Sequence, residues 1–480
     1  MPTSRPDGAT RREFLTYTAA AASASALIGA GPLDSHGRAS DPIPKARPRV
    51  PLKDGGQIRI GIIGPGGMGS GHMNALLNIG TWTKSTPATV DPNAPPEAEP
   101  PAPHEEIFNA ARNALGDVKV PEGKANLAIV AVCDVCDKRA EAARQRCADH
   151  QGIEVDSYRY HEDLVARDDI HAVLIASPEH WHAKHAEDAI LAGKDVYVEK
   201  PMTLRLEQAL RLYEVAKANP DRIIQVGTQY TMLPKYLAAR DLIQAGEIGH
   251  PTFSQTSYCR NSKNGEWLYY GIDPEWDPKT NLDWDRWCGD LGPDTWDPEV
   301  YARWRRYRKW STGIIGDLLV HKMTPLLMAI NAGWPTRVAA VGGHFVDKVM
   351  ENHDQVNLNV EFEKDHVMIV AGSTCNEIGL EDLIRGHRAN LYLGSRHCVM
   401  RPERIYVDDV DERTVECPDI GDPQDALRKN WLECIRTREP NRSTVELGTK
   451  VMVAVDLATR SMWDGGAYRF DPSTMKVTRA

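Results

Sequence analysis

The stretch IRIGIIGPGGMGSGHMNALL, residues 58–77, holds the pattern that decides the fold of this chain. The run from Ile58 to Ile63 is short, apolar and rich in β-branched side chains, which predicts a buried parallel strand. The residues after it match G-x-G-x-x-G, and a helical segment follows. Such glycines let the backbone approach a pyrophosphate, and the helix N-terminus offers free N–H groups. The stretch predicts a dinucleotide site formed by Gly64, Gly66, Gly67, Met68 and Gly69; the alternative is a glycine turn without a ligand.

The expected second strand, in NLAIVAVCDVCD (126–137), ends at Asp134. An acid at this position hydrogen-bonds the ribose 2′-hydroxyl of NAD and repels the 2′-phosphate of NADP. A Pro- and acid-rich segment over 80–125 separates the two strands, and its composition predicts a surface insertion. NAD is therefore the expected cofactor, in preference to NADP.

The order of the predicted strands and helices divides the chain. Strands alternate with helices up to RIIQVGTQY (222–230), which predicts a doubly wound parallel sheet. After about residue 250, strand patterns in HPTFSQTSYC, RVAAVGGHFV, QVNLNVEFE and HVMIVAGSTC lie close together, and closing helices are expected over 425–440 and 448–466. We predict an α/β chain with a Rossmann dinucleotide-binding domain over 57–201. A substrate-binding and oligomerisation α+β domain with a large, mostly antiparallel open sheet follows over 202–480.

The stretch VYVEKPMT (196–203) ends an apolar strand with an acid, an amine and a proline. A charged surface turn is the ordinary explanation. However, the tip of a parallel strand is where α/β enzymes place their chemistry. Lys200 at this tip is therefore a candidate for proton transfer, because an amine there can exchange a proton with a bound substrate.

A second pair of chemical groups lies in GDLLVHKMTPLL (316–327), where Asp317 and His321 are four residues apart. On a helix this spacing puts both side chains on one face. Alone, the pair is typical of a helix surface. Together with the glycine turn and the lysine it predicts an active site.

These motifs resemble those of the Gfo/Idh/MocA family, the group of glucose–fructose oxidoreductase and inositol dehydrogenase, over about residues 57–470. The resemblance implies NAD-dependent hydride transfer, with Lys200 beside the nicotinamide and hydrogen-bonded to the substrate hydroxyl. It further implies that His321 acts as general acid or base and that Asp317 contacts the substrate or orients His321. Pro201 is expected to follow a cis peptide bond. Family members usually form dimers or tetramers through the open sheet, so a homodimer or homotetramer is expected.

The resemblance also adds residues to the expected cofactor site, namely Ser177, Pro178, His182, Glu199, Lys200 and Gln229. The first three lie in SPEHWH (177–182), which resembles the Pro-x-x-x-His loop of the family. One departure is the segment Ser311-Thr312-Gly313, where family members usually carry more glycines. It puts the local substrate contacts in doubt, not the Asp-x-x-x-His motif.

An aromatic stretch over 258–312 precedes Asp317 and offers further contacts. Aromatic faces stack on sugar rings, and arginines bind hydroxyls or carboxylates. Packing of a long loop is the expected role of most of these tryptophans, and the run from Arg303 to Trp310 is the part expected at the pocket. The residues concerned are Trp267, Trp276, Trp284, Trp287, Trp296, Trp304, Trp310, Arg303, Arg305 and Arg306.

The N-terminal 56 residues read as a twin-arginine export signal followed by a loose segment. In TRREFLTYTAAAASASALIGAG (10–31), Arg11 and Arg12 precede a mild Ala-rich apolar run. The alternative is a short amphipathic helix that begins the fold. Export by this route moves folded proteins, so we expect a periplasmic protein whose cofactor is tightly bound.

Composition excludes other classes of protein. The net charge of −10 argues against a nucleic-acid partner, and no strongly apolar run of roughly eighteen residues predicts a permanent membrane span. The nine cysteines form no disulfide framework, and Cys133 and Cys136 make only one Cys-x-x-Cys. His180 and His185 are possible metal ligands. However, hydride transfer in the family needs no metal, so no metal site is expected.

Three functions remain open from the sequence. The first is a periplasmic oxidoreductase that transfers hydride to or from a hydroxyl carbon of a sugar, sugar derivative or cyclitol. The second is an NAD-dependent glycoside hydrolase that oxidises, eliminates and re-reduces its substrate. The third is a non-catalytic sugar-binding protein, against which the intact lysine and Asp-x-x-x-His motifs argue.

Overall fold

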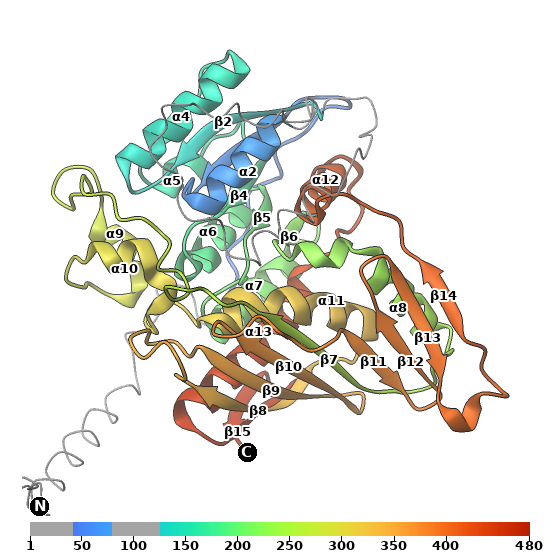
Figure 1. The fold of residues 1–480 in the computed structure, drawn as a ribbon. Helices are drawn as coiled ribbons and strands as arrows, with labels where there is room; N and C mark the ends of the chain where they lie inside the picture. The colour runs from blue at the N-terminus through green and yellow to red at the C-terminus, as the bar shows by residue number, and fades with distance from the viewer. Residues whose placement is uncertain (1–41, 79–124) are drawn as a thin grey trace, which may run out of the picture.

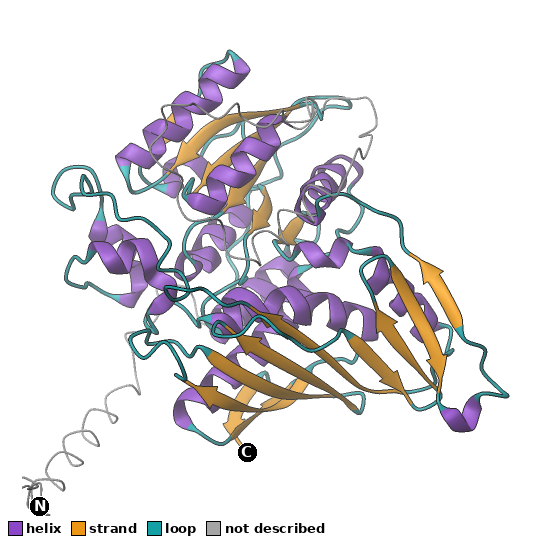
Figure 2. Cartoon of the chain, viewed as in Figure 1, coloured by secondary structure: helices purple, strands orange, loops and turns teal. Residues whose placement is uncertain are grey.

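The computed structural model describes residues 42–78 and 125–480 (Figure 1). The predicted export signal and residues 80–124 of the expected insertion lie outside these ranges. Within them, two sheets dominate the architecture, and helices cover both faces of the first sheet and one face of the second (Figure 2). No helix among the described residues is long and apolar enough to cross a membrane.

The first sheet is fully parallel and confirms the predicted Rossmann-type domain. Its strands are β1 (Ile58–Ile63), β2 (Leu127–Cys133), β3 (Asp156–Tyr158), β4 (Ala172–Ile175), β5 (Asp195–Val198) and β6 (Ile224–Val226). They pair in the order β3-β2-β1-β4-β5-β6, the doubly wound arrangement in which ligands bind at the carboxyl ends of the strands. Because β6 pairs with β5, this sheet continues past residue 201, the expected end of the domain.

Helices flank the parallel sheet on both faces. They are α2 (Gly67–Asn78), α4 (Asp137–Gln151), α5 (His161–Val165), α6 (Glu179–Leu191) and α7 (Leu206–Ala218). A late segment of the chain joins them, because α12 (Pro423–Thr437) packs Leu427 and Trp431 into the same core as Ile60 and Ile62. The Rossmann core therefore includes residues that follow the second sheet in sequence.

The second sheet is mostly antiparallel, as predicted. Its strands are β7 (Pro251–Cys259), β8 (Pro335–Gly343), β9 (Gln355–Phe362), β10 (His366–Ser373), β11 (Leu383–Gly386), β12 (Ala389–Leu393), β13 (His397–Pro402), β14 (Arg413–Glu416), β15 (Ala467–Asp471) and β16 (Lys476–Arg479). They pair in the order β14-β13-β12-β11-β7-β10-β9-β8-β15-β16. The pair β7 and β10 is parallel, because a long connection separates the two strands in sequence.

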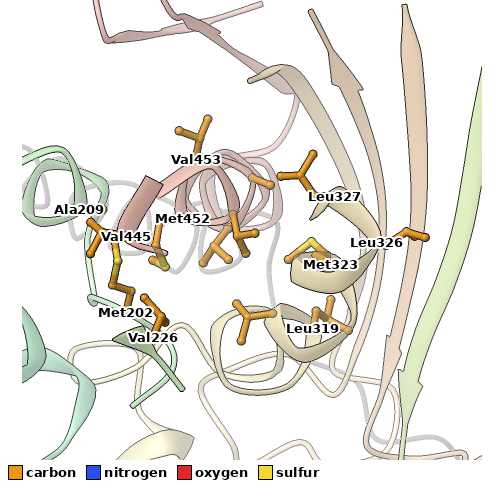
Figure 3. Packing of buried hydrophobic residues seen from close by; sticks show 14 of the residues in the cluster. Met202, Ala209, Val226, Leu319, Met323, Leu326, Leu327, Val445, Met452 and Val453 are labelled. Atoms are coloured by element: carbon orange, nitrogen blue, oxygen red, sulfur yellow. The ribbon is translucent and has the colours of Figure 1, made fainter. Parts of the chain in front are cut away.

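Three helices link the second sheet to the first, namely α8 (Pro234–Gln244), α11 (Val320–Ile330) and α13 (Val445–Asp464). Figure 3 shows α13 between Met202 and Val226 on one side and Leu319 and Met323 on the other. These side chains are almost fully buried, and burial of each such residue contributes roughly 1.5–3 kcal/mol. This shared core fixes the position of α11, and hence of His321, relative to the parallel sheet.

A compact aromatic unit follows β7 and carries α9 (Trp284–Cys288) and α10 (Pro298–Arg303). Its rings form a separate cluster around Trp284, Trp287, Trp304 and Trp310. In Figure 1 this unit lies beside α5 and α6 of the first domain. Most of the tryptophans thus pack the loop, while only part of the unit faces the site described next.

Candidate active site

The glycine turn packs tightly on one side and is open on the other. Gly64 has a φ of +79°, and a Cβ there would lie 2.5 Å from the backbone nitrogen of Ser177. A Cβ on Gly69 would lie 2.1 Å from the carbonyl oxygen of Gly64, whereas one on Gly67 would meet nothing within 4 Å. The first and last glycines therefore hold the turn against β4, and the middle of the turn faces free space. This geometry fits a ligand that approaches the backbone, as the pyrophosphate of a dinucleotide does.

A cavity of about 350 Å³ lies along this turn. Of the predicted cofactor residues, Gly64, Gly66, Gly67, Met68, Asp134, Ser177 and Pro178 line it. Gly69, His182, Glu199, Lys200 and Gln229 do not. The opposite wall was not predicted as cofactor-binding and comes from the aromatic unit, with Tyr270, Arg286, Trp287, Tyr301, Ala302, Trp304 and Arg305.

Asp134 lies at the end of β2, as the sequence predicted. Its side chain is 9% exposed, and its Oδ1 accepts a hydrogen bond of 2.9 Å from the backbone N–H of Cys136. The neighbouring Cys133 and Cys136 are buried free thiols, and burial raises the pKa of each. A raised pKa disfavours the reactive thiolate, so the Cys-x-x-Cys reads as part of the core.

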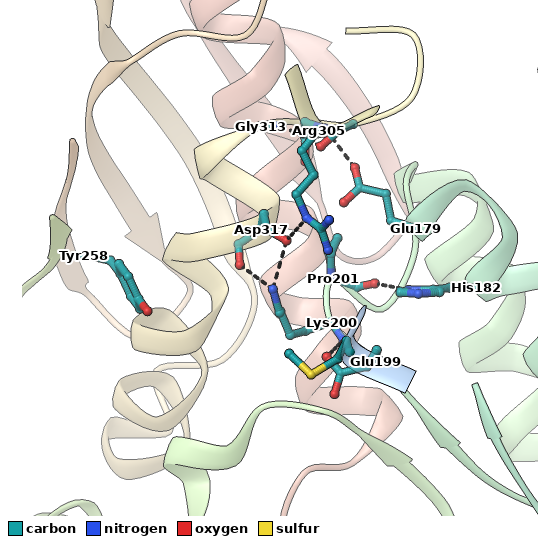
Figure 4. A network of polar contacts seen from close by, with 12 residues as sticks. Glu179, His182, Glu199, Lys200, Pro201, Tyr258, Arg305, Gly313 and Asp317 are labelled. Atoms are coloured by element: carbon teal, nitrogen blue, oxygen red, sulfur yellow. Dashed lines mark hydrogen bonds and ion pairs between the residues drawn. The ribbon is translucent and has the colours of Figure 1, made fainter. Parts of the chain in front are cut away.

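The predicted lysine and aspartate meet between the two domains (Figure 4). The Nζ of Lys200 donates to Asp317 Oδ1 at 2.9 Å and to the carbonyl oxygen of Asp317 at 2.8 Å. Arg305 Nε donates to the same Oδ1 at 2.9 Å. Burial alone would raise the pKa of Asp317, but Lys200 and Arg305 outweigh it and hold the pKa below its usual value. Asp317 is therefore a buried carboxylate shared by two cations.

The helix that carries Asp317 is not a regular α-helix. Residues Ile315–Leu319 form a π-helical turn, and α11 begins only after it. Such turns occur mostly as single insertions in helices, often at functional sites. The expected α-helical face is therefore altered locally, which lets Asp317 reach Lys200 while His321 stays nearby on the first turn of α11.

His321 is buried and carries an unsatisfied ring nitrogen. Burial first, and the Lys200 charge second, lower the pKa of His321 to about 3, so the ring is neutral at neutral pH. Its Nδ1 has no hydrogen-bond partner among the described residues. The ring lies beside Tyr230 and Tyr258, with centroid distances of 5.8 Å and 5.9 Å. A buried polar atom left free in this way fits a contact made only with a bound molecule.

Glu199 joins the first domain to α12 through residues that the sequence did not reveal. His72 Nε2 lies 2.8 Å from Glu199 Oε1, and Arg428 Nη1 donates to His72 Nδ1 at 3.0 Å. His72 must therefore carry its proton on Nε2 and donate to Glu199. Burial opposes ionisation, but the hydrogen bond from His72, together with the charge of Lys200, lowers the pKa of Glu199 to about 2. His72 follows the glycine turn in sequence, whereas no local signal marks Arg428.

Three further predicted residues hold the loops of the site. The Lys200–Pro201 peptide bond is cis, as the resemblance implied. His182 lies outside the cavity, because its ring nitrogens contact the carbonyl oxygens of Pro201 and Ser177, each at 2.7 Å. Gln229 begins a short 3₁₀ helix, Gln229–Met232, and its buried Oε1 has no partner among the described residues. Gln229 is thus free to bind a ligand amide, while His182 orients the strand ends.

Glu179 is a site residue that the sequence reading passed over, although it follows Pro178. It is fully buried, and its Oε1 accepts a 2.9 Å hydrogen bond from the backbone N–H of Thr312. Burial, and then the nearby charge of Asp317, raise the pKa of Glu179 to about 8. The signal that could have revealed it is an acid in the first turn of a helix that is otherwise almost wholly buried.

The histidines considered for a metal do not converge. His180 Nε2 lies 2.7 Å from the carbonyl oxygen of Trp287, and His185 Nδ1 lies 3.0 Å from Ser177 Oγ. Within residues 42–78 and 125–480, one group does bring metal-ligating atoms within 4.8 Å, namely His161, Glu162 and Asp188. Lys184 and Arg286 already neutralise its carboxylates, so it reads as an ion-pair network.

Two family models match the chain over most of its length. The model described as "Oxidoreductase family, NAD-binding Rossmann fold" (GFO_IDH_MocA) matches residues 58–228. The model of the "C-terminal alpha/beta domain" of the same family matches residues 292–469. The chain belongs to the Gfo/Idh/MocA family. The predicted resemblance is thereby confirmed.

Curated relatives match only part of the chain. The inositol 2-dehydrogenase of Salmonella typhimurium (strain LT2) is 33% identical over 123 residues, which are 26% of this chain and 35% of the relative. The inositol 2-dehydrogenase of Burkholderia lata is 33% identical over 138 residues, or 29% and 40% of the two chains. The matched segments thus span well under half of these relatives.

Solved structures share the fold over most of the chain. A levoglucosan dehydrogenase in complex with NADH and L-sorbose has a TM-score of 0.58 at 17% identity, covering 86% of this chain and 98% of that one. An NAD binding oxidoreductase from Klebsiella pneumoniae has a TM-score of 0.56 at 18% identity, with 88% and 98% covered. At these identities the likeness establishes the two-domain fold.

Proposed function

We propose that this protein is an NAD-dependent oxidoreductase that transfers hydride between the cofactor and a hydroxyl-bearing carbon of a sugar, sugar derivative or cyclitol. The observation that carries the proposal is the meeting of Lys200 and Asp317 near His321 at the carboxyl end of β5. Strand β4 lies between β5 and β1, the strand that the glycine turn follows. The inositol and levoglucosan dehydrogenases among the relatives support a polyhydroxylated substrate.

NAD, when bound, supplies the hydride acceptor or donor, and the side chains manage the proton. The Lys200 ammonium has three N–H groups, and two of them bind Asp317. The third is left for the oxygen of the reacting carbon. The neutral His321 has its free Nδ1 for the same oxygen or its neighbour. Asp317 fixes the direction of Lys200, and its charge balances the ammonium while Lys200 holds the proton.

Cofactor choice rests on Asp134, which lines the cavity at the end of β2. A carboxylate there favours the free 2′-hydroxyl of NAD over the 2′-phosphate of NADP.

We further propose that the chain is exported through its Arg11–Arg12 segment and works in the periplasm, and that it forms a homodimer or homotetramer through the uncovered face of the second sheet. Cell fractionation with an Arg11→Lys, Arg12→Lys variant and light scattering test these two points.

The central experiment measures reduced-nicotinamide absorbance of the purified protein with excess NAD and a panel of free sugars, cyclitols and glycosides. Steady accumulation with one substrate supports a dehydrogenase that releases its cofactor. Substitution Lys200→Met should lower kcat by a factor of about 10³ while NADH binding persists, because only the proton-transfer group is lost. If Lys200→Met retained full turnover, the proposed role of the site would be wrong.

A second outcome points to the alternative function. If a glycoside is consumed without net accumulation of reduced nicotinamide, the cofactor is recycled in place, and the protein is an NAD-dependent glycoside hydrolase. The same Lys200→Met variant should then lose glycoside cleavage as well. If sugar binds but neither reaction occurs with wild-type protein, the non-catalytic alternative replaces both.

A further inference from the structure

The aromatic unit closes over the part of the parallel sheet where a dinucleotide binds. We name residues 266–305 the cover. Its two short helices, α9 and α10, lie beside α5 and α6 of the first domain rather than on the second sheet (Figure 1). Residues of the cover line the cavity together with Asp134 at the carboxyl end of β2, where the adenosine ribose of a dinucleotide binds in a doubly wound sheet.

Backbone hydrogen bonds attach the cover to the turn after β2. The N–H of Asp283 donates to the Val135 carbonyl at 3.0 Å, and the N–H of Asp137 donates to the Asn281 carbonyl at 2.9 Å. Between them, Cys136 and Leu282 pair as an isolated antiparallel bridge. The cover thus adds a short piece of strand to the edge of the first domain.

Side chains tie the cover to two more places on the first domain. Trp181 Nε1 on α6 donates to the Trp287 carbonyl at 2.8 Å, and Tyr160 before α5 donates to Asp283 at 2.9 Å. On α4, Lys138 pairs with Asp273 at 2.6 Å and with Glu275 at 2.5 Å. The attachments surround the cavity on the side away from Lys200.

The chemistry of the enclosed wall matches one half of the cofactor. Tyr270, Tyr301 and Trp304 line this wall. Tyr270 is exposed and offers a ring on which a base stacks with about 1–3 kcal/mol, whereas Tyr301 and Trp304 are buried with Arg139 and Arg305 over their rings. Four arginines line the cavity, Arg139, Arg159, Arg286 and Arg305. Three of them also pair with carboxylates, Arg159 with Asp137, Arg286 with Glu162 and Arg305 with Asp317. The N–H groups that these pairs leave unused suit a pyrophosphate, because guanidinium groups bind phosphate oxygens with strong, directed hydrogen bonds.

We propose that the cover binds the adenosine–pyrophosphate half of NAD and must detach from the first domain before the cofactor can leave, so that detachment of the cover limits the rate of cofactor release. This inference rests on the proposed NAD-dependent function and names the residues that would retain the cofactor. It assigns Tyr270, Tyr301, Trp304 and Arg305 to cofactor binding in addition to the glycine turn.

A disulfide clamp tests whether the cover must detach. Opposite residues of an antiparallel bridge have Cα atoms about 4.5–5.5 Å apart, within the range that a disulfide spans. In Leu282→Cys, oxidation should therefore join position 282 to Cys136. Release of bound NADH, followed by its fluorescence after addition of excess NAD, should slow by at least a factor of ten and recover on reduction. The matched control is Leu282→Ser, treated with the same oxidant, which loses the same packing without a cross-link.

A charge-reversing substitution tests whether a weaker attachment of the cover speeds NADH release. Lys138 is partly exposed, lies outside the cavity and holds two acids of the cover. Lys138→Glu should speed NADH release by a factor of five or more, whereas Arg144→Glu on the same helix, whose partners among the described residues are Glu141 and Gln145, should not.

The outcomes separate the two proposals. If wild-type protein fails to bind NADH, the proposed function fails and this inference with it. If NADH binds but neither the oxidised clamp nor Lys138→Glu changes its release, the cover does not control the cofactor, and only this inference is overturned. Where the disulfide does not form, the Lys138→Glu result decides alone.

Discussion

Two walls face each other across the dinucleotide cavity, and they are built in opposite ways. The glycine turn works because side chains are missing, so that backbone reaches the cavity at Gly66 and Gly67. The cover works through large side chains, such as Tyr301 and Trp304. A local run of sequence is enough to build the first wall, whereas the second exists only when segments far apart in sequence meet.

The two walls also differ in how firmly they are held. The glycine turn continues the parallel sheet, with the Gly64 N–H donating to the Cys133 carbonyl at 2.9 Å. The cover is held by two backbone hydrogen bonds beside one isolated bridge, by side-chain hydrogen bonds and by packing of its aromatic cluster against Val135 and Cys136. Its ion pairs with the first domain are partly exposed, and each is worth at most about 1 kcal/mol. A segment with fewer backbone hydrogen bonds than the sheet it rests on opens at lower free energy.

The largest expected effect comes from adding a side chain to the glycine turn, the first wall, at Gly64. Gly64→Ala places a Cβ 2.5 Å from Ser177 at a φ of +79°, and strain plus overlap should cost about 3 kcal/mol or more of folding free energy. Urea unfolding and NADH titration should show both lower stability and weaker binding.

A matched glycine in the same run provides the control. Gly71 lies in α2 with nothing within 4 Å of its would-be Cβ, so Gly71→Ala should be neutral or stabilising by about 0.5–1 kcal/mol. Equal behaviour of the two variants would contradict the view that the first wall depends on missing side chains.

The contrast between the walls explains what the sequence could predict. The strand, glycine turn, helix and Asp134 are local patterns, and Lys200 and Asp317 belong to short motifs whose partners follow from the fold. The cover contains no such motif, and its tryptophans carry the same signal whether they pack together or face a ligand. Long-range contacts, such as the bridge between Cys136 and Leu282 and the hydrogen bond from Trp181 to Trp287, place them over the first domain.

The residues missed at the site have the same cause. Arg428 and His72 are far apart in sequence but adjacent in space, because α12 returns to the Rossmann core. Glu179 looks like an ordinary acid at a helix start, and only the approach of Thr312 buries it. The parallel pairing of β7 with β10 likewise follows from a long-range connection that no strand pattern reveals.

The next effect tests the one residue of the cover that touches the catalytic cluster. Arg305 lines the cavity and also donates to Asp317 Oδ1 at 2.9 Å. Loss of a hydrogen bond to a buried charge costs about 2 kcal/mol, so Arg305→Ala should lower kcat/KM roughly 30-fold. The control Arg303→Ala removes a neighbouring arginine that binds Glu299 and the backbone carbonyl of Tyr270 but does not itself line the cavity. Similar losses in both variants would mean that the arginines act only through packing of the cover.

A smaller effect is a change of folding stability with pH. It depends on Glu179, which lies where α6 meets the segment before Asp317. With the pKa of Glu179 raised to about 8, the folded protein holds a proton there that the unfolded chain releases near pH 4.5. Stability should therefore fall as pH rises through this window, and the fall should end above about pH 8. Glu179→Gln keeps the acceptor for the Thr312 N–H and removes the titration. Its stability relative to wild type should rise by roughly 1 to 2 kcal/mol between about pH 6 and pH 8. Parallel stability–pH curves for the two proteins would contradict a protonated Glu179.

The smallest expected effect tests whether a single hydrogen bond of the cover changes the rate of NADH release. Tyr301 accepts a 2.9 Å hydrogen bond from Arg139 across the cavity, and Tyr301→Phe removes it while the ring stays. The expected loss is about 0.5–1 kcal/mol, which should appear as a two- to five-fold faster release of NADH with little change in folding stability. Tyr307→Phe, in the same aromatic cluster but outside the cavity, should leave release unchanged. If Tyr301→Phe also leaves it unchanged while Gly67→Ala weakens NADH binding, the cofactor is held by the glycine wall alone, and the cover serves only to pack the chain.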